Sequence, residues 1–306
     1  MPDLTYEAIE VGKEFGPWKY PLNERIARYL EAVENAHPWH HERSPWGPPV
    51  APPSILGIAA ERFMESFTPV PPGTLHAKQE IETAAALRLD RQPVGYGRFA
   101  DKYERRGRKW FVFESRWRDE TGLLIGHSSL TMAFAKEPGA VQTGGRPPGG
   151  QDEEGVKSEG GSRKAEAGER KGELTPVVRT LTAEGMTAYS EDSANAVRGT
   201  SIHVQPEAAK KAGFGTTVAQ GLMSADYISE MMTTALGKDW FENTKLSLAF
   251  LRPVLAGETL TANGRLAEAM EEGAVVRRVY QVWCENGAGE AVTAGTATAL
   301  LMPDAS

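Results

Sequence analysis

The residues best suited to chemistry lie in the C-terminal half of this 306-residue chain, where Asp192, Asn195 and His203 follow one another within twelve positions. An imidazole titrates near pH 6.5, so His203 can take up or release a proton at physiological pH. The carboxylate of Asp192 can accept hydrogen bonds from water or from a donor side chain. A histidine taken alone is usually structural, so the surrounding pattern must decide whether these residues form a site.

Two other sequence patterns suggest a metal site or a dinucleotide-binding loop, but each lacks features that such a site requires. The segment His37-Pro38-Trp39-His40-His41 is rich in imidazole, but it lacks carboxylate or cysteine partners at ligand spacing, and Pro38 interrupts a helix. The glycine pairs in Gly95-Tyr96-Gly97 and Gly287-Ala288-Gly289 lack the glycine spacing and the following helix of a dinucleotide loop. We therefore expect neither a metal site nor a bound cofactor.

Charge and composition exclude several classes of partner. The formal net charge of −7 argues against nucleic acid, because nucleic-acid affinity comes largely from clustered Lys and Arg. The single cysteine, Cys284, allows no internal disulfide and fits a reducing compartment. The first twenty residues carry four acids and no apolar stretch, so no signal peptide or membrane anchor is expected. These features predict a cytoplasmic protein that binds neither nucleic acid nor membrane.

A linker separates two halves of the chain. Residues 138–174 hold ten glycines, seven acids and six bases, with no Phe, Tyr, Trp or Ile. Such a stretch cannot bury enough apolar surface to offset its conformational entropy. The predicted organisation is an N-terminal domain over residues 1–137, a flexible linker over 138–174 and a C-terminal domain over 175–306.

The two halves look like distant copies of each other. Each begins with a short predicted helix, at 22–30 and 181–189, and continues to a longer apolar helix, at 54–67 and 221–236. Each ends in two strand-like runs around a tight turn, at 110–135 and 275–302.

A long apolar helix followed by several antiparallel strands describes an α+β unit in which a curved sheet wraps around a central helix. This is the hotdog arrangement. Two copies in one chain predict a double hotdog, with two antiparallel sheets, each wrapped around its helix, joined edge to edge so that exposed strand edges are hidden.

The C-terminal half also resembles a known family. Its order of motifs is similar to that of the MaoC-like (R)-specific enoyl-CoA hydratases, whose pattern reads D-x-N-P-[IL]-H, then A-H-G, then R-P-V-x-x-G-D-T-L. The matching segments here are Tyr189–Asn195, Ile202–Ala209, Gly213–Leu222 and Phe250–Leu260. The N-terminal half, with Pro52-Pro53 and Tyr103–Arg108, resembles the non-catalytic N-terminal hotdog of two-domain members.

The resemblance implies roles for three residues. Asp192 and His203 would hold a water molecule between them, and the backbone amide of Gly221, at a helix start, would bind the thioester oxygen. Asp192 and His203 are eleven positions apart where the family motif has five. Asp192 therefore takes the family position only if the loop 196–201 bulges outward. Which of the pair takes the proton is left open.

Four further residues are candidates for binding substrate. Asn195 could hydrogen-bond Asp192 or the water. Arg198 could form a bidentate pair of hydrogen bonds with a substrate carboxylate. Lys245 and Arg252 could approach CoA phosphates. In the N-terminal half Pro53 stands opposite Gly221 and has no N–H to donate, so that half is expected to form a wall rather than a site.

The resemblance implies a hydratase or dehydratase acting on a 2-enoyl thioester of the enoyl-CoA or mesaconyl-CoA type, with an acyl-CoA or other acyl-thioester as partner. Two alternatives stay open. One is a hotdog acyl-thioesterase, which would use an acid and a helix N-terminus to cleave the thioester. The other is a non-catalytic module that binds acyl thioesters. A homodimer is also left open.

Overall fold

The computed structural model describes residues 2–135 and 172–301. The N-terminal half contains five strands and its helices in this order within the described residues: β1 Glu14–Lys19, α1 Leu22–Ala32, a 3-10 turn at Pro38–His40, α2 Ile55–Phe67, β2 Leu75–Thr83, β3 Val94–Arg105, β4 Arg108–Arg118 and β5 Leu124–Ala133.

The C-terminal half repeats this order with two extra short helices. Its described elements are β6 Val177–Thr180, α3 Ala183–Ser190, α4 Ala194–Val197, α5 Pro206–Lys211, α6 Gly221–Leu236, a 3-10 turn at Gly237–Trp240, β7 Thr244–Phe250, β8 Thr259–Glu272, β9 Val275–Asn286 and β10 Ala291–Leu301. The short helices α4 and α5 lie in the segment where the sequence places Asn195 and His203.

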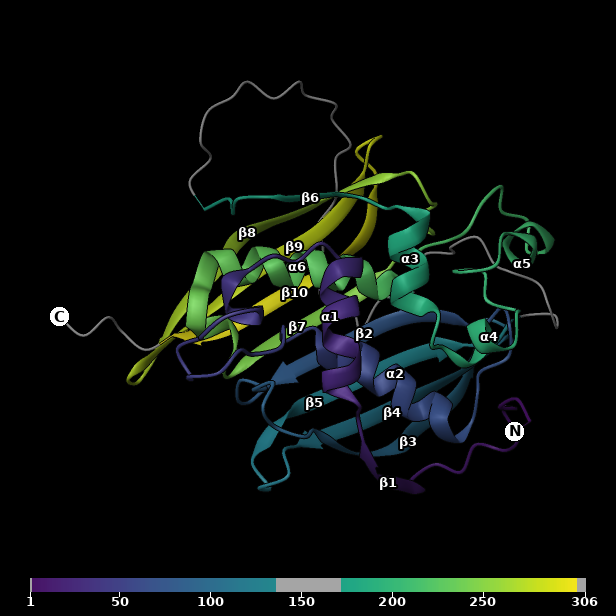
Figure 1. Ribbon diagram of the computed structural model, residues 1–306, viewed down its shortest axis with the longest axis horizontal. Helices are drawn as coiled ribbons and strands as arrows, with labels where there is room; N and C mark the ends of the chain where they lie inside the picture. Colours follow the sequence, from purple (N-terminus) through teal and green to yellow (C-terminus); the bar gives the residue numbers. More distant parts are fainter. Residues whose placement is uncertain (1, 136–171, 302–306) are drawn as a thin grey trace.

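All strands of the described chain form one ten-stranded sheet in the order β1-β3-β4-β5-β2-β7-β10-β9-β8-β6. The halves join where β2 pairs antiparallel with β7, from Lys78 opposite Ala249 to Thr83 opposite Thr244. Figure 1 shows the strands of the first half, in blue, continuing into those of the second, in green and yellow. The predicted double hotdog, with two antiparallel sheets joined edge to edge, is confirmed.

The helices α2 and α6 are the central helices of the two halves and lie against the concave side of the sheet (Figure 1). Every residue of α2 from Ile55 to Glu65 is buried, and so are most residues of α6. A helix buried on all sides has no solvent-facing stripe, so it is apolar around most of its circumference. The polar residues that such a helix does contain need a specific partner.

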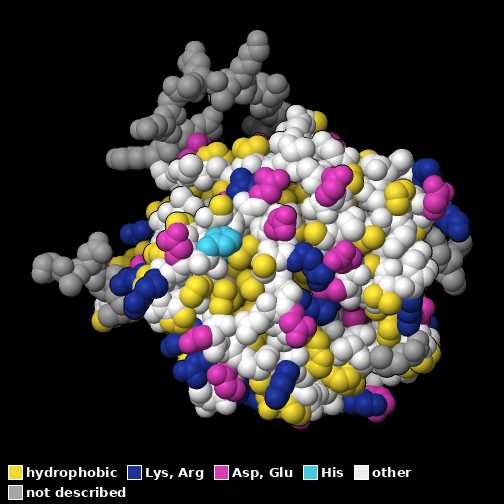
Figure 2. Space-filling model, viewed as in Figure 1, with side chains coloured by type: hydrophobic (Ala, Val, Ile, Leu, Met, Phe, Trp, Pro, Cys, Tyr) yellow, Lys and Arg dark blue, Asp and Glu magenta, His cyan; other side chains and the backbone are white. Residues whose placement is uncertain are grey.

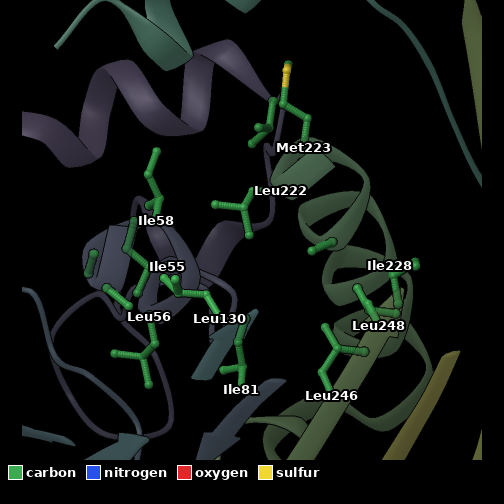
Figure 3. Packing of buried hydrophobic residues seen from close by; sticks show 14 of the residues in the cluster. Ile55, Leu56, Ile58, Ile81, Leu130, Leu222, Met223, Ile228, Leu246 and Leu248 are labelled. Atoms are coloured by element: carbon green, nitrogen blue, oxygen red, sulfur yellow. The ribbon is translucent and has the colours of Figure 1, made fainter. Parts of the chain in front are cut away.

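The two central helices also pack against each other. A methyl group at Gly57 of α2 would lie 3.0 Å from Cδ2 of Leu222 in α6 and 3.2 Å from Cδ1 of Ile81 in β2. Figure 3 shows Leu222 pointing from the start of α6 toward Ile55 and Leu56 of α2. The buried apolar residues of both halves therefore form one continuous core.

A buried polar cluster ties the short helices to this core. The carboxyl group of Asp226 in α6 accepts hydrogen bonds from the hydroxyls of Tyr29 in α1 and Tyr189 in α3, the latter at 2.7 Å. The Tyr29 hydroxyl also lies 3.2 Å from that of Ser54. Burial raises the pKa of Asp226 to about 7. Because two hydroxyls satisfy Asp226, the first helix of each half is held against α6.

The elements expected from the sequence are largely present. The helices expected at 54–67 and 221–236 appear as α2 and α6, and the two terminal hairpins appear as β4–β5 and β9–β10. Residues 138–171 of the predicted linker lie outside the described residues. Its last three residues, 172–174, are described and pair with β8 through hydrogen bonds from the Leu174 amide to Gly264 and from the Leu266 amide to Gly172.

The described helices include none that combines the length and the apolar character needed to span a membrane. On the face drawn in Figure 2, basic and acidic side chains are interspersed rather than gathered by sign.

The strands next to the junction depend on glycine for their close approach. A methyl group on Gly295 of β10 would fall on the carbonyl oxygen of Ser247 in β7 and 3.0 Å from the Cα of Leu248. We predict that Gly295→Ala lowers the free energy of unfolding by about 1–3 kcal/mol, the usual cost of overpacking. Urea titration would measure it. Gly287→Ala is the control, since no atom lies within 4 Å of its added methyl group, and an equal loss in both variants would contradict the explanation.

Candidate functional site

A cavity of about 180 Å³ lies between the two halves. The C-terminal half contributes the segment 200–203, the start of α6 and the end of β7. The N-terminal half contributes residues of α2, the loop 70–76 that leads into β2, and Met132 of β5. The cavity is thus a shared site, with walls that neither half could form alone.

His203 lines this cavity from the turn between α4 and α5. Its ring Nδ1 lies 2.6 Å from the carbonyl oxygen of Val218. A carbonyl only accepts, so Nδ1 carries the proton and Nε2 is left as the acceptor. Burial lowers the pKa of His203 to about 4. The imidazole is therefore neutral at physiological pH, with a free nitrogen that can accept a proton.

Gly221 is the first residue of α6 and also lines the cavity. Its N–H donates to no acceptor among the described residues, as expected in the first turn of a helix. A methyl group here would lie 2.7 Å from the ring of Phe250. Close packing against Phe250 is thus one reason why position 221 is a glycine. The glycine also leaves an unblocked amide at the positive end of the helix dipole.

Asp192 is not brought together with His203 at the cavity. The residues that line the cavity include His203 but not Asp192. The Asp192 carboxylate instead binds three arginines of the N-terminal half: Arg25, Arg28 at 3.3 Å and Arg62 at 2.7 Å. The sequence could not show this, because all three arginines come from more than 120 positions away. The segment between Asp192 and His203 contains α4 rather than a simple bulge.

Two of the four predicted binding residues line the cavity. Asn195 does so while donating its Nδ2 to the Val70 carbonyl at 3.3 Å. Arg252 lies at the cavity with an exposed side chain that pairs with Glu290 at 3.3 Å. The other two are elsewhere. Arg198 pairs with Asp3, and Lys245 binds Glu80 at 3.1 Å and Glu82 at 3.0 Å across the β2–β7 junction.

The N-terminal half supplies polar groups that the sequence reasoning missed. Glu61 and Glu65, one turn apart on α2, both line the cavity, and so does His76 at the start of β2. The Nη1 of Arg62 donates to Glu61 at 3.2 Å and to Glu65 at 3.3 Å. The available signal was the three charged residues Glu61, Arg62 and Glu65 in a largely apolar helix, since charged residues are rarely buried without a partner.

Burial shifts the titration of these groups. The pKa of Glu61 is raised, and that of Glu65 is raised to about 7, in each case mainly by desolvation and against the pull of Arg62. Burial lowers the pKa of His76 to about 4. The cavity therefore contains two neutral imidazoles and two carboxyl groups that bind protons more tightly than exposed glutamates do.

The N-terminal half retains a copy of the histidine geometry. The Nδ1 of His40 lies 2.7 Å from the Val50 carbonyl, as His203 does from Val218. Its Nε2 is buried without a hydrogen-bond partner among the described residues. The ring of Phe241 packs beside it with ring centres 6.1 Å apart, and the rings of Trp39 and Trp46 pack against Phe241.

The other histidines of this segment do not gather into a ligand set. His41 contacts the Asn35 carbonyl through Nε2 at 3.1 Å, and His37 caps its own turn by accepting from the Trp39 amide. Across the described ranges no group of three or more His, Cys, Asp or Glu side chains could hold a metal ion.

Comparison with known proteins agrees with this fold. Structures that are similar over nearly the whole chain include a MaoC-like dehydratase (TM-score 0.71, 16% identity, 97% of this chain and 99% of the other). A MaoC-like dehydratase from Phytophthora capsici is also similar (0.65, 15%, 99% and 99%). So is a conserved hypothetical protein of Mycobacterium tuberculosis described as a double hotdog (0.59, 11%, 98% and 98%). At these identities the likeness establishes the fold.

No curated protein matches the chain. The family model that matches is the MaoC-like domain, over residues 183–282. This range contains His203, Gly221, β7, β8 and part of β9, and so includes most of the C-terminal residues that line the cavity. Residues 183–282 of this double-hotdog chain thus match the MaoC-like domain family.

Proposed function

We propose that the protein is a hydratase or dehydratase that adds water to, or removes it from, the double bond of a 2-enoyl thioester. The observation that carries this proposal is the placement of two groups in one cavity. One is the neutral imidazole of His203, oriented by Val218 with Nε2 free, and the other is the unpaired amide of Gly221. A conjugate addition of water needs a base for the water and a donor for the carbonyl oxygen.

In the hydration direction His203 accepts a proton from water as the oxygen attacks C3. The electrons of the double bond then move toward the thioester carbonyl, where charge develops on the oxygen. The Gly221 amide and the dipole of α6 stabilise that charge. Dehydration follows the same steps in reverse. Protonation of C2 requires a further acid, and the Asp192 carboxylate is occupied by arginines away from the cavity wall.

The N-terminal half shapes the acyl pocket in this proposal and has no site of its own. Leu75 and Met132 contribute apolar surface to the cavity. His40 lacks the other requirement, because Pro52 and Pro53 stand just before α2 whereas Gly221 begins α6, and proline carries no N–H. Arg252, exposed beside the cavity, is the remaining candidate for a contact with CoA phosphates.

A thioesterase is the second candidate, because carboxyl groups and a helix N-terminus do share the cavity. Incubation with crotonyl-CoA and mesaconyl-CoA separates the two activities. A hydratase removes the enoyl absorbance and releases no thiol, whereas a thioesterase releases free CoA. A protein that binds the thioester and does neither would be a binding module.

We predict that His203→Ala folds and lowers turnover roughly 10²–10⁴-fold, the range for loss of a positioned base. The loss follows from removing the nitrogen that accepts the water proton. Steady-state hydration of crotonyl-CoA would measure it, with circular dichroism to check the fold. His40→Ala is the matched control, because His40 has the same backbone contact outside the cavity. A folded His203→Ala protein with a near-normal rate would remove His203 from the chemistry.

A second prediction tests the Gly221 amide apart from its packing. Phe250→Leu makes room for a side chain at position 221, so Gly221→Ala and Gly221→Pro are compared in that background. The backbone accepts proline, because Gln220 is extended at φ −67 and ψ 135. Alanine keeps the N–H and proline removes it, so the proline variant should turn over on the order of 10²-fold more slowly. Equal rates in two folded variants would place the oxyanion contact elsewhere.

A further inference from the structure

Two buried carboxyl groups face the cavity from the N-terminal half. Glu61 and Glu65 lie one turn apart on α2 and are 9% and 6% exposed. Residues four apart on a helix share one face, and here that face meets the wall that carries His203 and Gly221. The Nε2 of Gln220, the residue just before Gly221, lies 3.5 Å from Glu61 Oε1. The carboxyl groups therefore adjoin the start of α6.

Within the part of the chain that the structure describes, Arg62 is the one arginine or lysine that contacts either glutamate. The Arg62 guanidinium is shared among Glu61, Glu65 and Asp192. Arg25 and Arg28 bind Asp192 and not the two glutamates. The remaining neighbours are the Ala194 amide on Glu65 at 3.2 Å and the His76 ring, whose Nδ1 lies 4.0 Å from Glu61. Like charges at close range in a buried site cannot both persist, so the pair retains a proton.

Each carboxyl group also has an oxygen available to carry that proton. The hydrogen bonds of Glu65 all use Oε2, and those of Glu61 all use Oε1, within the part of the chain that the structure describes. Glu61 Oε2 and Glu65 Oε1 accept nothing there. The raised pKa of both groups agrees with this arrangement. Because both carboxyl groups accept from Arg62 Nη1, the protonation of one affects the ionisation of the other.

We infer that Glu61 and Glu65 share one proton and deliver it to C2 of the substrate, so that the N-terminal half supplies the general acid for a reaction whose base is His203. This inference rests on the proposed hydratase function. In hydration, the water oxygen bonds to C3 while His203 takes the water proton, and the electron pair of the double bond moves onto the thioester carbonyl. That pair returns to form the C2–H bond with the carboxyl proton. The carboxylate then regains a proton from the imidazolium through cavity water.

Asp192 acts in this arrangement as a positioning residue. Its Oδ1 accepts from Arg62 Nε at 2.7 Å, which holds the guanidinium between the two halves. Its charge also opposes ionisation of both glutamates. Asp192→Asn should therefore lower the pKa of the pair and move the alkaline limb of the rate profile to lower pH.

The decisive experiment uses Glu61→Gln, Glu65→Gln and the double variant in the full chain. Removing either glutamate leaves the other a larger share of Arg62, so it ionises and the acid is lost. Each single variant should lower kcat roughly 10²–10⁴-fold with KM changed only a few-fold, and the double variant should be little worse than either. Glu230→Gln is the control, since Glu230 is a partly buried glutamate of α6 with a raised pKa, paired with Arg179 away from the cavity.

Two further readouts separate an acid from a structural pair. The infrared carbonyl band of a protonated carboxyl group should be present in the folded wild type near neutral pH, weaken as the pH rises through about 7, and lose intensity in either variant. The wild-type rate should fall over the same range because the acid form is lost, and Asp192→Asn should shift that fall to lower pH. If Asp192→Asn lowers the rate by the same factor at every pH, Asp192 rather than the glutamate pair is the acid, and the inference is overturned.

The outcomes distinguish this inference from the proposed function. If the wild type hydrates enoyl thioesters and either folded single variant keeps a normal rate, the shared acid is wrong and the hydratase stands. If the wild type hydrates neither crotonyl-CoA nor mesaconyl-CoA, the proposed function fails and the acid role fails with it. Unfolded glutamine variants would be replaced by Glu61→Asp and Glu65→Asp, which keep the charge and retract the carboxyl group. A normal rate in both would overturn the inference.

Discussion

The pairing of β2 with β7 is the constraint on which the rest of the structure depends. This one antiparallel contact, six residues long on each side, fuses two sheets and sets α2 beside α6 at a fixed distance. Gly57 then meets Leu222, and Glu61 comes within reach of Gln220. The same pairing removes an edge strand from each half, which would otherwise invite association. The cavity exists because the two central helices are held in this register, and not because either half encloses it.

Duplication produced two similar frameworks that now contribute different chemistry. Both halves hold a histidine by the same backbone contact, His203 to Val218 and His40 to Val50. In the C-terminal half that histidine meets the free amide of Gly221. In the N-terminal half it is enclosed by aromatic rings, and prolines stand before the helix. The N-terminal half instead presents two carboxyl groups of α2 to the shared cavity. The differences between the halves are therefore complementary rather than a simple loss of function in one of them.

Local pattern was enough to predict two helices and the terminal hairpin of each half, because helix and strand periodicity depends on near neighbours in sequence. The placement of α2, α6 and both terminal hairpins follows from that periodicity. Of the predicted site residues, His203 and Gly221 line the same cavity. Asp192 did not, because its environment is set by Arg25, Arg28 and Arg62 from the other half. Lys245 was predicted to approach CoA phosphates, but it lies on β7 and pairs with Glu80 and Glu82 of β2. Only the fused sheet brings these three residues together. Glu61 and Glu65 were missed for the same reason, since a search confined to the C-terminal motif could not include them.

Arg62 connects the stability of the fold with the chemistry of the site. A guanidinium buried in the core is costly unless it is paired, and the pairing here takes carboxylates from both halves. Asp192 alone would neutralise it, yet Asp192 is already satisfied by two more exposed arginines. The charge of Arg62 is therefore divided, and neither glutamate beside it receives a full counterion. Burial then favours a protonated carboxyl group where an exposed helix would carry two carboxylates. The electrostatic arrangement that holds the halves together also keeps an acid in its neutral form at the wall of the cavity.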